Sequence, residues 1–211
     1  MKVFVPGNKK FEGALNYIYA ISKHSFPKIE ISGVKELDDD PITLVSNPLS
    51  SNVAYQQQGN ELINIDIDIG SFKVFPSHYQ LSTIIGGTPP LNFSLLGTND
   101  PNEGWIPIDS YRYDPYLCPY TMGSQSTWCE TRGIKLITPN HYVGPFRFFR
   151  YALHYSRWEL GNNQRTYDLR LGGIELYGNL YRNDLDMFIM RTCRCHRRPL
   201  LSIISFVTFV V

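Results

Sequence analysis

Residues 72–109, FKVFPSHYQLSTIIGGTPPLNFSLLGTNDPNEGWIPID, carry the strongest structural signal in this sequence. Short runs of alternating apolar and polar residues are separated by clusters of Gly, Pro, Asn and Asp, which is typical of antiparallel sheet. Residues 91–96 alternate in this way, and after a Gly-Thr-Asn-Asp turn the chain resumes at Trp105. This spacing predicts a β-hairpin. Two more strands are predicted upstream of it, at residues 72–75 and 79–83, with a proline between them.

The rest of the chain extends an all-β pattern around one helix. Residues 61–69 form the clearest strand, because isoleucine occupies every second position and two aspartates lie between. These aspartates, Asp66 and Asp68, are expected on the solvent face of a half-buried strand and not in a catalytic pair. Residues 10–25 have apolar residues at helical spacing and predict a helix packed over one end of a sheet. The remaining predicted strands are residues 28–31, 42–45, 134–137, 145–153 and 168–178.

Long polar segments connect these strands. The predicted loops are residues 33–41, 46–60, 111–132 and 156–166. We count about eight strands and no alternation of strand and helix, and this predicts an all-β sandwich with one short N-terminal helix.

Composition limits the classes of function. A chain of 211 residues with 43% hydrophobic and 14% aromatic residues can build one large domain with a proper core. The 18% of charged residues is too low for a disordered chain. A net charge of +1 supplies no overall field toward nucleic acid or an anionic membrane, so neither is expected as a partner.

Five motifs in a fixed order resemble the factor V/VIII type C, or discoidin, domain. They are the central hairpin, the preceding Pro76-Ser77-His78-Tyr79, then Phe146-Arg147-Phe148-Phe149-Arg150, Gly161-Asn162-Asn163 and Ile174-Glu175-Leu176-Tyr177-Gly178. The variant they resemble most is the intracellular one found beside BTB domains. The resemblance implies an eight-stranded jelly-roll sandwich of the galactose-binding-like type. It covers about residues 7–180, so residues 1–180 are expected to form the domain and residues 181–211 a tail outside the fold.

The resemblance also implies that ligands bind to loops gathered at one end of the sandwich. By position these loops are residues 33–41, 47–60 and 83–90. Tyr55 offers an aromatic platform, and the amides around it offer the donors and acceptors that sugar hydroxyls need. An anionic membrane is not expected, because the first loop carries three consecutive aspartates. The candidate ligand residues are Asn47, Leu49, Asn52, Tyr55, Gln56, Gln57, Ile85 and Thr88.

Residues 111–132 form a long loop rich in aromatic residues, which we call the Tyr-rich insertion. Tyrosine and tryptophan are enriched at the energetic centres of protein interfaces. The candidate interface residues are Tyr113, Tyr116, Tyr120 and Trp128. The sequence therefore supports two functions. The main hypothesis is protein recognition through the end loops and this insertion, and the alternative is carbohydrate binding through residues 47–60 and 83–90.

No catalytic, metal or cofactor motif is recognisable, so a non-enzymatic module without cofactor is expected. The aspartates at residues 38–40 are expected in a solvated turn, and His78 and His154 on ordinary strands. Cys118 and Cys129 flank one loop and could be bridged or reduced.

Residues 1–6 lack the apolar core of a secretory signal, which favours a cytoplasmic location. The alternative is that the chain is a fragment of a larger protein whose own leader is lost. The C-terminal run LLSIISFVTFVV is shorter than the roughly 20 residues of a spanning helix. We expect it to be a non-native or disordered end, and membrane attachment is the alternative.

Overall fold

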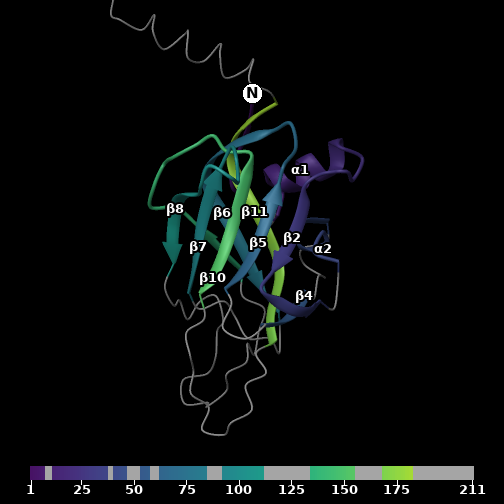
Figure 1. The fold of residues 1–211 in the computed structure, drawn as a ribbon. Helices are drawn as coiled ribbons and strands as arrows, with labels where there is room; N and C mark the ends of the chain where they lie inside the picture. Colours follow the sequence, from purple (N-terminus) through teal and green to yellow (C-terminus); the bar gives the residue numbers. More distant parts are fainter. Residues whose placement is uncertain are drawn as a thin grey trace, which may run out of the picture.

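The chain folds into two antiparallel β-sheets that pack face to face, with two short helices at one side (Figure 1). This computed structural model describes residues 1–7, 11–37, 40–46, 53–57, 62–84, 92–111, 134–154 and 168–182. The predicted β-sandwich is confirmed. The described residues form eleven strands, more than the expected eight, because three short strands, Lys2–Phe4, Val34–Leu37 and Val53–Gln57, were not anticipated.

The first sheet has the order β3-β4-β11-β6-β9, and β1 also pairs with β11. Its strands are β1 (Lys2–Phe4), β3 (Val34–Leu37), β4 (Val53–Gln57), β6 (Lys73–Thr83), β9 (Ile134–Ile137) and β11 (Asp168–Tyr181). The second sheet has the order β2-β5-β10-β7-β8. Its strands are β2 (Lys28–Ser32), β5 (Ile63–Asp68), β7 (Asn92–Thr98), β8 (Ile106–Tyr111) and β10 (Phe148–His154). The helices are α1 (Ala14–Ile21) and α2 (Thr43–Ser46).

The predicted central hairpin is confirmed as β7 and β8. In its turn, Asp100 Oδ1 accepts a hydrogen bond of 2.9 Å from the Asn102 backbone N–H. An aspartate side chain that binds the backbone two residues later stabilises a turn, which explains why the Gly-Thr-Asn-Asp motif ends in aspartate. The glycine of that motif, Gly97, lies against the ring of Phe146, and a Cβ there would overlap the ring. The motif therefore sets both the turn and the packing of the hairpin.

The two strands expected on either side of Pro76 are one strand, β6, and the prediction of a break was wrong. Proline lacks an N–H and is tolerated inside a sheet at a bulge. Pro76 lies opposite Gly178, and the register between β6 and β11 shifts between Tyr177 and Gly178. Gly178 has a φ of 137°, and a Cβ there would overlap Phe75 O. The glycine that ends the Ile-Glu-Leu-Tyr-Gly motif therefore allows β11 to lie close to Phe75 and Ser77, the residues on either side of the proline.

Three local predictions were wrong on one side of the molecule. Val34–Leu37 and Val53–Gln57, expected in loops, are strands β3 and β4. Residues 42–45, expected as a strand, mostly lie in helix α2. The polar β4 is a strand because it pairs with β3 and with β11, which its own residues do not reveal. Asp40 starts α2, since its Oδ1 accepts a 3.0 Å hydrogen bond from the Ile42 N–H.

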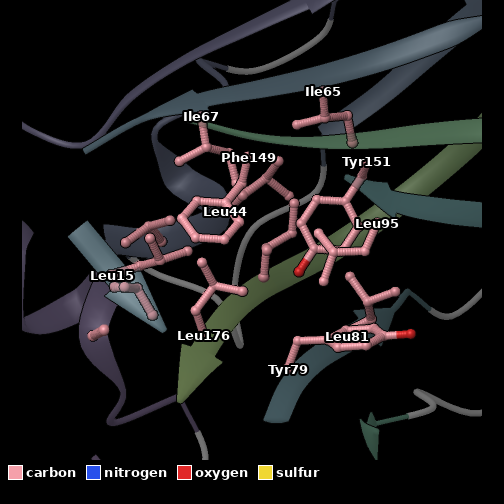
Figure 2. Packing of buried hydrophobic residues seen from close by; sticks show 14 of the residues in the cluster. Leu15, Leu44, Ile65, Ile67, Tyr79, Leu81, Leu95, Phe149, Tyr151 and Leu176 are labelled. Atoms are coloured by element: carbon pink, nitrogen blue, oxygen red, sulfur yellow. The ribbon is translucent and has the colours of Figure 1, made fainter. Parts of the chain in front are cut away.

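The core lies between the sheets and extends to both helices. In β5 the isoleucines are buried and the alternating polar residues are half-buried, as predicted. Figure 2 shows side chains from both sheets meeting Leu15 of α1 and Leu44 of α2. The helix α1 is shorter than residues 10–25, because Phe11 is buried in a left-handed conformation (φ 59°) before the helix begins.

The last described strand ends where the resemblance ends. Tyr181 of β11 still pairs with Lys73. Of the expected tail, residues 181–211, Tyr181 is the last residue of β11, and everything from residue 183 onward lies outside the described residues. In the described part of the chain, no helix combines the length and the apolar character needed to cross a membrane.

Candidate functional site

One end of the sandwich gathers the strand ends that border the predicted ligand segments. We call it the converging end; strand β8 points toward it in Figure 1. In the first sheet Thr83 pairs with Leu171, and in the second sheet Phe93 pairs with Tyr111. Strands β2, β4, β6, β8 and β10 finish here, and β3, β5, β7, β9 and β11 begin here, as the paired residues show. Connecting segments that are far apart in the sequence therefore leave the sheets and rejoin them at the same end of the sandwich.

Gly33 shows that both sheets contribute to the same end. It is the only residue between β2 and β3, which belong to different sheets. Its φ is +77°, and a Cβ would overlap Leu62 O, just before β5. A glycine is therefore required at the point where the chain passes from one sheet to the other.

Three of the eight candidate ligand residues lie on a described strand. Tyr55, Gln56 and Gln57 belong to β4, where Gln57 pairs with Val34 and Gln56 with Asp168. They were expected in a loop, and the strand instead holds their backbone in the first sheet next to the converging end. The other five candidates, Asn47, Leu49, Asn52, Ile85 and Thr88, lie outside the described residues.

The Tyr-rich insertion begins and ends at the converging end. Tyr111 closes β8 in the second sheet, and Ile134 opens β9 in the first sheet. The interface candidates Tyr113, Tyr116, Tyr120 and Trp128 lie outside the described residues, as do the two flanking cysteines. The segments behind both functional hypotheses thus start from the same end of the sandwich, which sequence reasoning did not reveal.

An aromatic cluster supports this end from inside. Phe93 is fully buried, and its ring stacks on the half-buried Tyr111 with centroids 5.0 Å apart and an angle of 22°. It also meets the rings of Tyr79 and Tyr151 at centroid distances of 6.1 Å and 6.3 Å. Because Tyr79 comes from the first sheet and the others from the second, the cluster joins the two sheets beneath the converging end.

A buried carboxylate, Asp109, completes this support. It is 3% exposed and accepts a 2.7 Å hydrogen bond from the Tyr79 hydroxyl. Asn140, which follows β9, donates its amide to the other carboxylate oxygen. Burial, followed by the hydrogen bond to Asp109, raises the pKa of Tyr79 far above its ordinary value. Burial and the charge of Asp109 raise the pKa of Tyr111 to about 12. The hydrogen bond between Asp109 and Asn140 therefore connects β8, the strand before the Tyr-rich insertion, to the segment that follows β9.

Sequence reasoning missed Asp109, since it ends an ordinary-looking strand. Alternation with Ile108 would place Asp109 on the solvent face, so the sequence carried no signal for its burial. The register shift between β7 and β8 at Ile108 lets both residues be buried.

The outer face of the second sheet carries two ion pairs. Arg150 binds Asp66 through two hydrogen bonds of 2.6 Å, and Arg147 binds Asp68 at 2.8 Å and 2.9 Å. These hydrogen bonds raise the pKa of both arginines. Arg150 also lies 4.3 Å from the Trp105 ring centre. The arginines of the Phe-Arg-Phe-Phe-Arg motif thus pair with the aspartates that alternate in β5. We assign both ion pairs a structural role, because each carboxylate is bound by an arginine in, or directly before, the neighbouring strand β10.

The histidines singled out in the sequence lie on strands, as expected. His78 is half-buried in β6, and its Nδ1 lies 3.1 Å from Ser77 Oγ. His154 is the last residue of β10.

Comparison with known proteins finds similarity only in structure. No protein-family model matches the chain, and the search of curated proteins finds no relative. Among solved structures, chitosan-binding module 2 of a chitosanase/glucanase from Paenibacillus sp. IK-5, in complex with chitotriose, matches with a TM-score of 0.47 and 18% identity. The match covers 72% of this chain and 96% of that one.

Two further structures match in the same way. The family 32 carbohydrate-binding module from Streptococcus pneumoniae EndoD has a TM-score of 0.47 and 11% identity, covering 72% of this chain and 97% of that chain. The C-terminal domain of a chitobiase from Bacteroides fragilis has a TM-score of 0.49 and 10% identity, covering 72% and 95%. At these identities and scores, what each neighbour binds is a property of that neighbour.

Proposed function

We propose that this protein is a non-catalytic carbohydrate-binding module whose ligand site is the converging end of the sandwich. The observation that carries this proposal is the register of the two sheets, which brings five strand ends and five strand starts together around one end. Binding sites are commonly built from loops positioned on a rigid scaffold. Here the strand ends that border the candidate ligand segments are braced by Asp109 and the aromatic cluster.

The chemistry of the candidate residues favours sugar as the ligand class. Amide side chains donate and accept hydrogen bonds at once, as sugar hydroxyls do. Asn47, Asn52, Gln56 and Gln57 supply amides, and Tyr55 supplies an aromatic ring. A strand that holds Tyr55 to Gln57 favours binding, because a fixed backbone reduces the conformational entropy lost when a ligand is bound.

A glycan array tests this proposal. We expect the full chain to bind one family of glycans saturably, and Tyr55→Ala and Gln57→Ala each to weaken binding at least tenfold. Tyr142→Ala is the matched control, since Tyr142 is 63% exposed and lies between β9 and Phe146, away from the converging end. This variant should bind like the wild type. An array without any saturable binding, or equal losses in all three variants, would contradict the proposal.

Protein recognition is the second candidate, and one observation favours it. The Tyr-rich insertion departs from Tyr111 and returns at Ile134 on the same end, and Tyr111 is itself half-buried in a ring stack. Aromatic residues on a fixed base suit an interface. If this candidate is correct, a Tyr116→Ala, Tyr120→Ala double variant should lose a partner isolated with the wild type, whereas Tyr55→Ala should retain it. Quantitative pull-down with that partner measures both.

A further inference from the structure

The edge of β11 opposite β6 is covered by three different elements. β4 pairs with residues 168–171 of β11, and β1 pairs with residues 178–180. Among the described strands, none pairs with the stretch between them on this edge. The start of α1 lies there instead, because a Cβ on Gly13 would overlap Leu176 O. A helix N-terminus therefore takes the place of a strand along this part of the edge.

The side chain of Glu175 links the helix to this edge. It is 1% exposed, and its Oε1 accepts backbone N–H bonds of 2.7 Å from Leu15 and 2.9 Å from Leu176. Its Oε2 accepts a bond of 3.2 Å from Asn16. One carboxylate thus satisfies donors of the first turn of α1 and of the uncovered strand edge. These are groups that would otherwise be buried without a partner.

A neighbouring side chain fastens the segment just before the helix. Gln80 lies directly opposite Glu175 in the pairing of β6 and β11. Its Oε1 accepts hydrogen bonds from the Phe11 N–H at 3.0 Å and from the Tyr177 hydroxyl at 2.8 Å. The N-terminal segment is therefore held by two adjacent polar side chains, of which Gln80 is neutral and Glu175 is titratable.

We propose that the protonation state of Glu175 controls how tightly α1 is held against the edge of β11. The helix is docked through a carboxyl group that must leave water to make its contacts, and it can undock only by returning that group to water. Proton binding to Glu175 and the docking of α1 are consequently linked.

The groups around Glu175 provide no compensating positive charge in the described structure. Tyr177 of its own strand and Tyr151 of β10 face it, and burial and Glu175 raise the pKa of both tyrosines. Glu12 precedes the helix and adds a further negative charge near Tyr177. Helix α2 presents residues 43–46, none of which titrates. Lys2 of β1 borders the same helix but lies over the Tyr17 ring, 3.5 Å from its centre.

The direction of the switch follows from these surroundings. Burial raises the pKa of Glu175 to about 7, although the backbone N–H bonds act in the opposite direction. Protonation at Oε2 would leave in place the two short bonds that Oε1 accepts from Leu15 and Leu176. The docked state therefore binds a proton more tightly than an undocked state in which Glu175 has its ordinary pKa. Docking is favoured at acidic pH and weakens as the pH rises toward 7.

Two NMR measurements on the full chain test this switch. The first follows the side-chain carboxyl carbon of Glu175 with pH, and we expect a midpoint near 7. The second measures hydrogen exchange at the Leu15 and Leu176 amides, corrected for intrinsic exchange rates. These rates give the equilibrium constant for undocking of α1 from β11. It should increase by up to about tenfold per pH unit between pH 5 and 7, and then level off, because one proton is released on undocking.

Glu175→Gln should abolish this pH dependence, while Glu103→Gln, at an exposed glutamate in the β7–β8 turn, should leave it unchanged. Should Glu175→Gln fail to fold, the carboxyl titration of the wild type decides alone. A midpoint in the ordinary range of glutamate, about 4 to 5, would overturn the proposal. The proposal would also be overturned if hydrogen exchange at the Leu15 amide had the same pH dependence in Glu175→Gln and in the wild type.

Discussion

Two buried tyrosines differ in one hydrogen bond. Tyr79 donates its hydroxyl to Asp109, whereas the Tyr151 hydroxyl is buried with no hydrogen-bond partner among the described atoms. Their rings lie 6.1 Å apart in the same cluster, so the apolar surroundings are shared. Comparing the two tyrosines therefore shows how much a buried hydroxyl with a hydrogen-bond acceptor, and one without, each contributes to stability.

Removing each hydroxyl should have opposite effects on stability. We expect Tyr79→Phe to lower the free energy of unfolding by roughly 1.5–3 kcal/mol, because Asp109 loses a donor while it stays buried. Tyr151→Phe should be neutral or stabilising by up to about 1 kcal/mol, because it removes a desolvated group without a partner. Urea unfolding of both variants at one pH measures the difference. A larger loss for Tyr151→Phe than for Tyr79→Phe would contradict this assignment.

Buried acids are also the residues that sequence reasoning could not find. Asp109 and Glu175 occupy strands whose alternation is regular, so each can be taken for a solvent-facing position. Their partners lie 30 residues away for Asp109 and 160 for Glu175. Only the packing of β8 on β6 and of α1 on β11 shows that these carboxylates are needed. Asp66 and Asp68, in contrast, were expected on the solvent face of a half-buried strand, and they lie on its outer face, half-buried and paired with arginines.

Whole elements were predictable where their own residues determine them. The β7–β8 hairpin and strand β5 follow from turn residues and alternation, and both are confirmed. Strands β3 and β4 were missed because they depend on pairing partners distant in the sequence. Strand β6 was divided at Pro76 because the bulge that tolerates the proline is supplied by Gly178 of another strand.

The packing of the hairpin can be tested at Gly97. A Cβ at this position would overlap the buried Phe146 ring, so Gly97→Ala should destabilise the protein by roughly 1–3 kcal/mol through overpacking. Gly7→Ala is the matched control, because nothing lies within 4 Å of a Cβ at Gly7. It should change stability by no more than about 0.5 kcal/mol. Thermal unfolding compares the two, and equal midpoints would show that the ring can move away at little cost.

At the scale of the molecule, the two functional hypotheses from the sequence concern one place. The candidate sugar residues on β4 and the flanks of the Tyr-rich insertion border the same end of the sandwich. Sequence reasoning assigned the ligand loops to one end only through a family resemblance, and it could not place the insertion. The insertion could not be placed from the sequence because its position depends on the register of the two sheets, which brings together residues that are far apart in the chain.

The converging end also differs from the opposite end in what supports it. Beneath it lie the Asp109 hydrogen bonds and the aromatic cluster, which join the sheets. The opposite end has the tight connection from β5 to β6, where Asp68 Oδ1 accepts a 2.8 Å hydrogen bond from the Gly70 N–H. The end of the sandwich that binds a ligand can therefore be identified from the backbone amides whose NMR signals shift when the ligand is added.

Titration of the full chain with the strongest glycan-array ligand, followed by backbone NMR, tests the central claim most directly. We predict saturable shifts of amides at the converging end, such as those of Thr83, Phe93 and Tyr111. The amides of Gly70 and Lys73 at the opposite end should not shift. The absence of any glycan that binds, or shifts confined to Gly70, Lys73 and their neighbours, would contradict the assignment of the converging end as a carbohydrate site.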